Sequence, residues 1–343
     1  MKCVIVGPSK YHYTKSIAAA ISQMGHDVAV FYYEDFYEAC TYWQRKMYKL
    51  GYHSLETKWN DKWENELKKV CISVSDYGKL EYSLIVVSNI ELSDSVFLEI
   101  PDCEKIICMW DTVKICKKSF LSKLRYFQQV HVFKKNDRVL LKNIGIQSDY
   151  LPLGYNADVF IPKDVNKDID ICFIGMPDDE RLHTVEHVAR YAVEKNIRMY
   201  ICGEWYDKRH LWRKFIYKNK HPELYRFIDN KMIDAREAAN IYNRSKICLN
   251  INRKVHTSIN PRTFEILATQ SCMFMNKGVD VAGILTPGVD YIEYADDNDL
   301  LVKIDYILNN DPERIKVSRS GYSKIVGKYS IQQTYAEILS RNV

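Results

Sequence analysis

The segment from Asn260 to Glu265 places a guanidinium and a carboxylate at the expected start of a helix. Asn260 is a favourable N-cap, and Pro261 suits the first helical position, where no N–H is needed. Arg262 and Glu265 are three residues apart, so their side chains share a helix face. A helix N-terminus with these two groups can hold a diphosphate and the hydroxyls of a sugar. The local spacing leaves open a capped amphipathic helix with a surface ion pair.

The elements that would position these side chains form a strand–loop–helix unit. Residues 246–252 (KICLNIN) are a short apolar run with polar exits, which predicts a buried strand before the loop. Strands alternate with helices along the whole chain, which predicts an α/β fold with parallel sheets. Strands are expected at 2–6, 28–32, 83–88, 105–110, 129–133, 170–174, 198–202, within 226–233, at 246–252 and at 272–276.

Length and a linker signal predict two domains. The 343 residues exceed one ordinary hydrophobic core. Residues 150–162 (YLPLGYNADVFIP) are bracketed by prolines and contain a glycine, which is typical of a linker. We therefore predict an N-terminal Rossmann-like domain over 1–155 and a second Rossmann-like domain over 156–330. Residues 331–343 would form a closing helix that packs back on the first domain.

Composition and charge exclude several classes of protein. A net charge of +5 does not indicate a nucleic-acid binder. The ten cysteines form no CxxC pair, and several lie in apolar strand-like runs, so a reducing compartment is expected and a zinc site is not. The chain starts with a strand rather than a signal peptide, and no run is long enough to span a bilayer. We expect a cytoplasmic protein, with peripheral contact to the inner membrane surface as the open alternative.

The first half offers candidate catalytic groups at its strand ends. Asp111 follows the strand at 105–110, and His12 lies just beyond the first strand, so both could act on the acceptor side of a cleft. Asn89 is a similar candidate, and for Asn89 and Asp111 a role as a cap or turn residue is at least as probable. Gly7 ends the first strand, but a single glycine there does not make the GxGxxG pattern of dinucleotide binding.

Residues 208–226 (KRHLWRKFIYKNKHPELYR) are basic and aromatic. The pattern favours a charged helix whose lysine stems lie along the protein surface, and contact with a lipid surface is the alternative.

Four blocks in the second half carry a resemblance to a known family. They are DICFIGMPDDERLHTV, AREAANIYNRSKICLNINR, NPRTFEILATQSCMFMN and GVDYIEYADDNDLLVKIDYILNNDPERIKVSRSGYSKIVGKYS. Their order and spacing resemble the group-1 glycosyltransferases of the GT-B fold, and more narrowly the spore-maturation CgeB-like branch. The resemblance covers 168 to about 339. The first half is similar only in its strand order, in the Trp110–Asp111 pair and in the start of the linker.

The resemblance implies two facing Rossmann-like domains, with a nucleotide-sugar bound on the second and the acceptor mainly on the first. Glu265 matches the glutamate that holds the donor ribose. Arg181, six residues after Gly175, stands where these enzymes place a basic residue for the diphosphate. The resemblance also implies that the base lies near Lys231–Asp234. The expected donor-binding residues are Gly7, Arg181, Arg253, Asn260, Arg262, Thr263 and Glu265, with Thr263 in a turn whose amides would cap a phosphate.

Two positions depart from the family pattern. Thr257, beside His256, replaces the glutamate that related family-4 enzymes carry eight residues before the ribose glutamate, which bears on the sugar and on the catalytic geometry. Gln270 replaces a common glycine five residues after Glu265, and we expect this change to affect only local packing.

The sequence therefore predicts transfer of a sugar from a nucleoside diphosphate to an unidentified acceptor, with retention favoured by analogy with the family. The acceptor could be a glycan, a lipid-linked saccharide, a protein or a small molecule. No cofactor and no metal are expected, because arginines and helix-end amides can stabilise the leaving diphosphate. The nearest acidic pair, Asp296–Asp297, is interpreted as a helix cap. A nucleotide-sugar epimerase or hydrolase on the same fold, and a non-catalytic sugar-binding or coat-assembly protein, are the alternatives.

Overall fold

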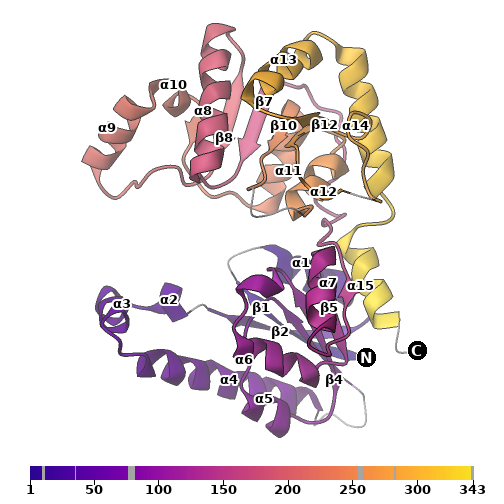
Figure 1. The fold of residues 1–343 in the computed structure, drawn as a ribbon. Coiled ribbons are helices and arrows are strands. Elements are labelled where there is room, and N and C mark those ends of the chain that lie inside the picture. Colours follow the sequence, from indigo (N-terminus) through magenta and orange to yellow (C-terminus); the bar gives the residue numbers. More distant parts are fainter. Residues whose placement is uncertain (10–11, 35, 76–81, 254–257, 282, 341–343) are drawn as a thin grey trace. The chain divides into compact units, whose positions relative to one another are not determined.

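The computed structural model describes residues 1–9, 12–34, 36–75, 82–253, 258–281 and 283–340. Contacts divide the chain into two compact units (Figure 1). Unit 1 contains Met1–Leu153 and Thr334–Val343, and unit 2 contains Gly154–Gln333. Each unit has one sheet of six strands, and every described strand pair is parallel. The predicted α/β class with two parallel Rossmann-like sheets is confirmed.

Unit 1 has the strand order β2-β1-β3-β4-β5-β6. Its strands are β1 (Lys2–Pro8), β2 (Asp27–Tyr33), β3 (Tyr82–Val87), β4 (Glu104–Met109), β5 (Gln129–Val132) and β6 (Asp149–Tyr150). Its helices are α1 (His12–Gln23), α2 (Phe36–Ala39), α3 (Tyr42–Lys49), α4 (Ser54–Ser75), α5 (Asp94–Glu99), α6 (Lys118–Lys123) and α7 (Lys135–Lys142), with short 3-10 turns η1 (Val113–Ile115) and η2 (Leu124–Tyr126).

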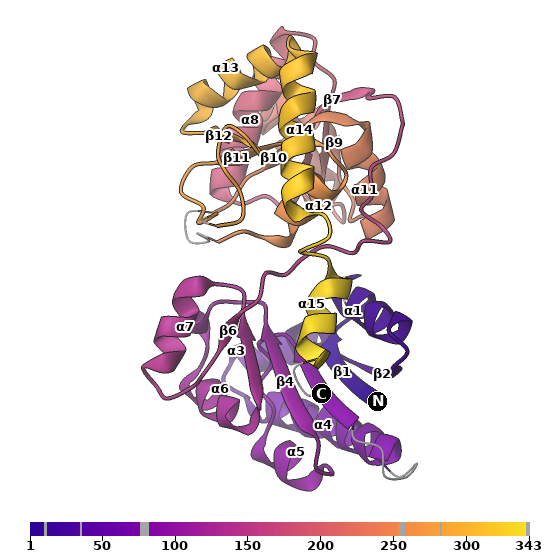
Figure 2. The same ribbon diagram turned by 90° about the vertical axis from the view of Figure 1, so that its right-hand side faces the viewer.

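The core of unit 1 forms because its central strands β1, β3 and β4 are buried on both faces and helices cover them. Trp63 of α4 packs against Phe31 and Tyr33 of β2, with ring centroids 6.2 and 6.0 Å away. Helix α15 (Ile331–Ser340) closes the chain, and most of it belongs to unit 1. Its Ile338 carbonyl accepts a hydrogen bond of 3.4 Å from the Gln129 side chain in β5, and Figure 2 shows the helix along this sheet.

Unit 2 has the strand order β12-β11-β10-β7-β8-β9. Its strands are β7 (Ile169–Ile174), β8 (Met199–Cys202), β9 (Ile228–Asp229), β10 (Ser245–Asn250), β11 (Cys272–Asn276) and β12 (Ile292–Tyr294). Its helices are α8 (Asp179–Glu194), α9 (Leu211–Lys220), α10 (Pro222–Tyr225), α11 (Ala235–Arg244), α12 (Pro261–Ala268), α13 (Asp297–Leu308) and α14 (Asp311–Ile325). Among the described residues, no helix has the length and apolar character needed to cross a bilayer.

The strand order of unit 2 reverses between β7 and β10, which are neighbours in the middle of the sheet. From β7 the chain continues to β8 on one side, and from β10 it continues to β11 on the other. The connections that leave these two strands therefore run to opposite sides of the sheet. Such a switch point is where open parallel sheets bind ligands. In unit 1 the corresponding reversal lies between β1 and β3.

Candidate functional site

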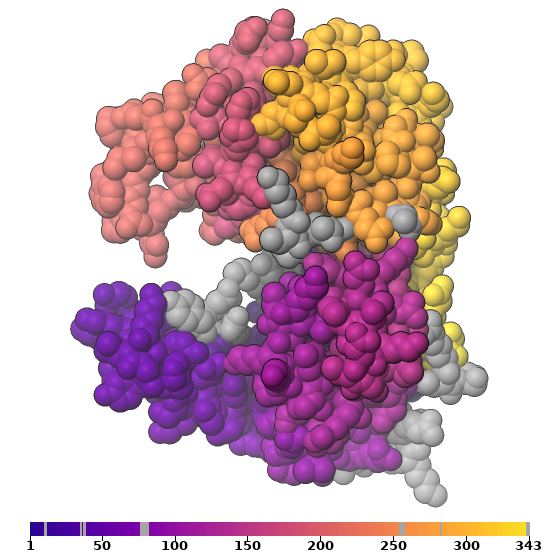
Figure 3. All heavy atoms as spheres, in the orientation of Figure 1, coloured from indigo at the N-terminus to yellow at the C-terminus, as the bar shows by residue number. Residues whose placement is uncertain are grey.

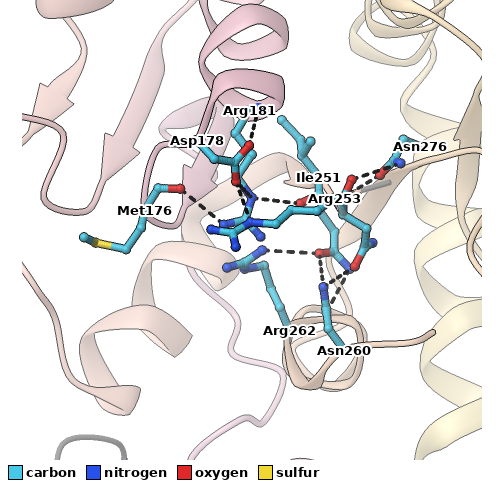
Figure 4. A network of polar contacts seen from close by, with 10 residues as sticks. Met176, Asp178, Arg181, Ile251, Arg253, Asn260, Arg262 and Asn276 are labelled. Carbon is cyan, nitrogen blue, oxygen red and sulfur yellow. Dashed lines mark hydrogen bonds and ion pairs between the residues drawn. The ribbon is translucent and has the colours of Figure 1, made fainter. Parts of the chain in front are cut away.

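Helix α8 begins beside the end of β7 and brings Arg181 to the switch point of unit 2. Asp178 is its N-cap and accepts a hydrogen bond of 3.0 Å from the backbone N–H of Arg181. The Arg181 guanidinium donates to the carbonyl of Ile251 at 3.1 Å and to the carbonyl of Met176 at 3.2 Å. Arg181 thus ties the loop after β7 to the loop after β10, as Figure 4 shows.

The start of α12 is connected to β10 and β11 by hydrogen bonds between asparagine residues. Asn260 caps the helix as predicted, and its Oδ1 accepts from the N–H of Thr263 at 3.0 Å. The Asn260 amide donates to Asn250 Oδ1 at 3.0 Å and to Asn252 Oδ1 at 2.6 Å. Asn276 Oδ1 in turn accepts from the backbone N–H of Asn252 at 2.7 Å. The direction of the α12 N-terminus is therefore fixed by partly buried hydrogen bonds within the protein.

Arg262 extends from this helix start over the end of β7. Its guanidinium lies 5.7 Å from the centre of the Phe173 ring and makes one long hydrogen bond, 3.4 Å, to Asn250 Oδ1. A Cβ atom on Gly175 would come within 3.1 Å of the Nη2 atom of Arg262. Glycine at the end of β7 therefore leaves the space that the guanidinium occupies.

Arg181, Arg253 and Arg262 gather three positive charges beside one carboxylate (Figure 4). Arg253 Nε donates to Asp178 Oδ2 at 2.8 Å, and Arg181 Nε lies 3.4 Å from the same oxygen. Within the described residues, no carboxylate forms an ion pair with Arg262. Burial and then the nearby Arg262 charge lower the pKa of Arg181 to about 10. The site has a surplus of positive charge that an anion would neutralise.

The pKa of Asp178 is set by burial and by the arginines beside it. Burial alone would raise the pKa of its carboxyl group, but the hydrogen bonds from Arg181 N–H and Arg253 outweigh burial and lower the pKa. Asp178 is therefore an anion at neutral pH, and it neutralises one of the three guanidinium groups.

Glu265 lies one turn beyond Arg262 on α12 and is 7% exposed. Its charge acts on the buried Tyr242, because it contributes, after burial, to the raised pKa of that phenol. Thr263 is fully buried, and its N–H is already taken by Asn260, so in this geometry Thr263 fixes the helix start and offers no backbone amide to a ligand.

The structure thus brings together Arg181, Arg253, Asn260, Arg262, Thr263 and Glu265 in unit 2, whereas Gly7, His12 and Asp111 belong to unit 1. The departures at His256 and Thr257 lie outside the described residues. Gly7 has a packing reason of its own, because a Cβ there would meet the side chain of Thr14 at 2.4 Å.

At the sheet edge of unit 1, Asn89 holds the turn after β4. Its Oδ1 accepts from the N–H groups of Trp110 and Asp111 at 2.8 and 2.9 Å, and its amide donates to the Asp111 carbonyl at 3.0 Å. The cap role that the sequence left open for Asn89 is therefore its role here. The Asp111 side chain remains exposed. His12 opens α1, with its ring 4.2 Å from that of Tyr13.

Sequence reasoning missed Asn250, Asn252 and Gly203 as parts of the site. Asn250 and Asn252 are polar residues in an otherwise apolar strand segment, and both are buried. Buried polar side chains are uncommon, so their presence in that segment was the available signal in the sequence. Gly203 has a positive φ of 146°, and a Cβ there would lie 2.2 Å from the Gly175 carbonyl. The ends of β7 and β8 can approach this closely only with glycine.

A second polar cluster joins α8 to α13. His183 Nε2 and His187 Nδ1 lie 3.2 and 3.5 Å from Asp297 Oδ2, an arrangement that could also hold a metal ion. Asp296 caps α13 by accepting from the N–H of Asp299, which confirms the cap predicted for the acidic pair. All ten cysteines are free thiols, and none belongs to a cluster of possible metal ligands in the described part of the chain.

Residues 181–340 match the family model for glycosyl transferase-like proteins, a stretch that contains all three arginines of the site. No curated protein matches this sequence at a significant level.

Solved structures match the chain over its whole length. Sucrose-phosphate synthase from Thermosynechococcus elongatus has a TM-score of 0.68 at 12% identity, with 100% of this chain and 99% of that chain covered. A glycosyltransferase from Rickettsia africae has a TM-score of 0.65 at 12% identity, with 99% and 97% covered. Anabaena HepE, solved with UDP and glucose, has a TM-score of 0.63 at 10% identity, with 99% and 100% covered. The chain has the GT-B fold of these structures.

Proposed function

We propose that the protein is a glycosyltransferase that moves a sugar from a nucleoside diphosphate to an acceptor. The observation that carries the proposal is the group of Arg181, Arg253 and Arg262 near the carboxylate of Asp178, at the switch point of unit 2. A diphosphate carries the charge that this site lacks. The match of residues 181–340 to glycosyl transferase-like proteins supports the same conclusion.

The chemistry follows from where charge develops. The leaving nucleoside diphosphate gains negative charge as the glycosidic bond breaks, so fixed cations bind the transition state more tightly than the ground state. Arg181 and Arg262 are held in place before the ligand arrives, by two carbonyls and by the Phe173 ring respectively. We propose that these guanidinium groups do the work that a metal ion does in other transferases, and that transfer needs no metal.

The rest of the donor is assigned by position. Glu265, one turn along α12, would accept hydrogen bonds from the ribose hydroxyls. The base would lie near Lys231–Asp234, where the Lys231 ammonium is paired with Asp229 at 3.0 Å and with Glu237 at 2.6 Å. Placement in the CgeB-like branch, a hexose as the transferred sugar and retention at the anomeric carbon rest on the sequence blocks and on analogy.

The test is acceptor-dependent release of nucleotide. Thermal-shift screening first selects the nucleotide, since a ligand at a hundred times its dissociation constant adds about 2.7 kcal/mol of stability. UDP-sugars are natural first probes, because HepE was solved with UDP. Nucleotide release is then measured with and without a panel of saccharide and lipid-linked acceptors, in the presence of excess chelator.

The proposal predicts release that needs an acceptor and persists in chelator. Release without any acceptor would indicate a hydrolase, and interconversion of the nucleotide-sugar would indicate an epimerase. Tight nucleotide binding with no turnover under every acceptor would favour a non-catalytic binding protein. Loss of transfer in chelator, restored by magnesium or manganese, would contradict the metal-free mechanism.

A further inference from the structure

Helix α9 (Leu211–Lys220) of unit 2 buries none of its residues. Tyr217 is the residue of α9 that is partly covered, and its ring lies 5.3 Å from Tyr206 and 4.8 Å from His221. The sequence favoured a charged helix whose lysine stems lie along the protein surface, with contact to a lipid surface as the alternative. In the structure the apolar side chains of α9 other than Tyr217 are exposed. Figure 3 shows the salmon-coloured atoms of this region projecting at the left-hand edge of unit 2.

The exposed apolar side chains of α9 form one face. Leu211, Trp212, Phe215 and Ile216 follow an i, i+1, i+4, i+5 spacing, which places them together on a helix of 3.6 residues per turn. Their exposed fractions are 83%, 58%, 64% and 53%. Tyr217 lies on the opposite side of the helix and holds it to the unit. Large contiguous apolar surfaces of this kind mark interaction sites in soluble proteins.

Positive charges border this face on both sides. By the same helical geometry, Lys214 and Lys218 lie along one edge, and Arg213 and Lys220 lie along the other. Residues 208–220 contain six lysines and arginines and no acidic residue. Arg213 pairs with Asp207 at 2.8 Å, but in the part of the chain that the structure describes no carboxylate pairs with the three lysines.

We propose that α9 is an interfacial anchor that binds the surface of an anionic lipid bilayer. An apolar face with Trp, Phe and Leu, flanked by lysines, is the pattern of helices that lie in the plane of a membrane surface. The apolar side chains enter the level of the acyl chains, and the lysine ammonium groups reach up to the lipid phosphates. A protein partner fits this helix less well, because lysine is depleted in protein interfaces relative to the rest of the surface and three lysines border this face. The inference does not depend on the proposed sugar transfer.

The test uses the full chain and vesicles of two compositions. Vesicles of phosphatidylcholine with phosphatidylglycerol should sediment with the protein, and vesicles of phosphatidylcholine alone should bind at least about tenfold more weakly. Binding to the anionic vesicles should fall as salt is raised, because salt screens the lysine charges. The W212S/F215S variant should bind the anionic vesicles at least about tenfold more weakly than the unmodified protein, since it loses the central apolar side chains.

A matched control comes from another helix of the same unit. Val302 and Tyr306 on α13 are an exposed apolar pair, one turn apart, on a helix that also carries Asp297, Asp299 and Asp305. V302S/Y306S should leave vesicle binding unchanged, and unaltered circular dichroism and thermal unfolding would show that both variants are folded. Equal vesicle binding by W212S/F215S and the unmodified protein would overturn the proposal. Failure of the unmodified protein to bind anionic vesicles, or its self-association through α9 instead, would overturn it equally.

Discussion

The two sheets end in edges of opposite character. In unit 1 the polar groups at the strand ends are used by the protein itself. Asn89 binds the backbone of Trp110 and Asp111, and the buried Asp137 accepts from Thr112 Oγ1 and Val113 N–H at 2.9 and 3.0 Å. In unit 2 the asparagines bind one another and the backbone. Arg181 and Arg253 pair with Asp178, whereas Arg262 has no ion-pair partner among the described residues.

This difference indicates how a ligand site can be separated from a well-capped sheet edge on the same type of fold. Polar residues at strand ends are not enough, because both units have them. The informative feature is charge held in place without compensation, since a fold has no structural reason to gather like charges. On that criterion we propose that the anionic donor binds to unit 2 and that acceptor or catalytic groups come from unit 1.

The largest expected effect tests the role of unit 1. Asp111→Asn should lower turnover by about a hundredfold or more if this exposed carboxylate acts as an acid or base. Nucleotide affinity should remain as in the unmodified protein, because the proposed donor contacts lie on unit 2. His12→Gln is examined in the same way. Activity close to that of the unmodified protein in both variants would leave unit 1 without a chemical role at these residues.

The next effect concerns stability and compares one residue type at the two edges. Asn250→Ala removes a buried side chain that is hydrogen-bonded to the side chains of Asn260, Thr263 and Arg262. The free energy of unfolding should therefore fall by about 2–3 kcal/mol. Asn89→Ala, in a less buried turn, should lower it by only about 1 kcal/mol. Chemical denaturation of both variants measures the two values. A smaller loss of unfolding free energy for Asn250→Ala than for Asn89→Ala would contradict the difference proposed between the two sheet edges.

Glu265→Gln should weaken donor binding by about tenfold. The change keeps the shape of the side chain but removes its charge and one acceptor oxygen, and hydrogen bonds to a charged acceptor contribute about 1.5–3 kcal/mol each. Calorimetry with ribose and deoxyribose forms of the same nucleoside diphosphate provides the control. If the unmodified protein binds both forms equally, the ribose contact assigned to Glu265 does not exist.

The smallest effect comes from Gln270, which has a φ of 53°. It follows the C-cap Thr269 of α12, and the bonds from Gln270 N–H to Leu267 and from Ser271 N–H to Ile266 form a Schellman motif. Gln270→Gly should therefore stabilise the protein by about 0.5–1 kcal/mol, because glycine adopts a left-handed backbone without strain. Asn196, with a φ of 54° after α8, provides the control: Asn196→Gly should gain less, since asparagine tolerates this conformation. Thermal unfolding of the two variants distinguishes them.

Gln270 also shows where sequence reasoning fell short. The replaced glycine was expected to matter only for local packing, but the structure shows that backbone conformation is the reason for glycine at this position. Most strands were predictable because each contains an apolar run of several residues. Strands β6 and β12 have only two and three residues, which is too short for an apolar run to be recognised. Arg262 was found from the local pattern of a helix start and Arg181 from the family resemblance, but only the strand order brings residues so far apart in sequence together.

Helix α9 illustrates the same limit at the surface. The basic and aromatic pattern of residues 208–226 was visible in the sequence, yet periodicity does not say which face of a helix meets the protein. That information lies in Tyr217, whose contacts with Tyr206 and His221 turn the apolar face outward.

The charge surplus of unit 2 is tested most directly by calorimetry of UDP and uridine binding to Arg262→Ala. A charge-assisted contact contributes about 1.5–3 kcal/mol, so UDP affinity should fall at least about tenfold, while uridine affinity should hardly change. Arg244→Ala is the matched control, because Arg244 pairs with Asp168 at the amino edge of the same sheet, and it should bind UDP like the unmodified protein. An equal loss of UDP and uridine affinity in Arg262→Ala would show that Arg262 is structural and would contradict the assignment of this site to a diphosphate.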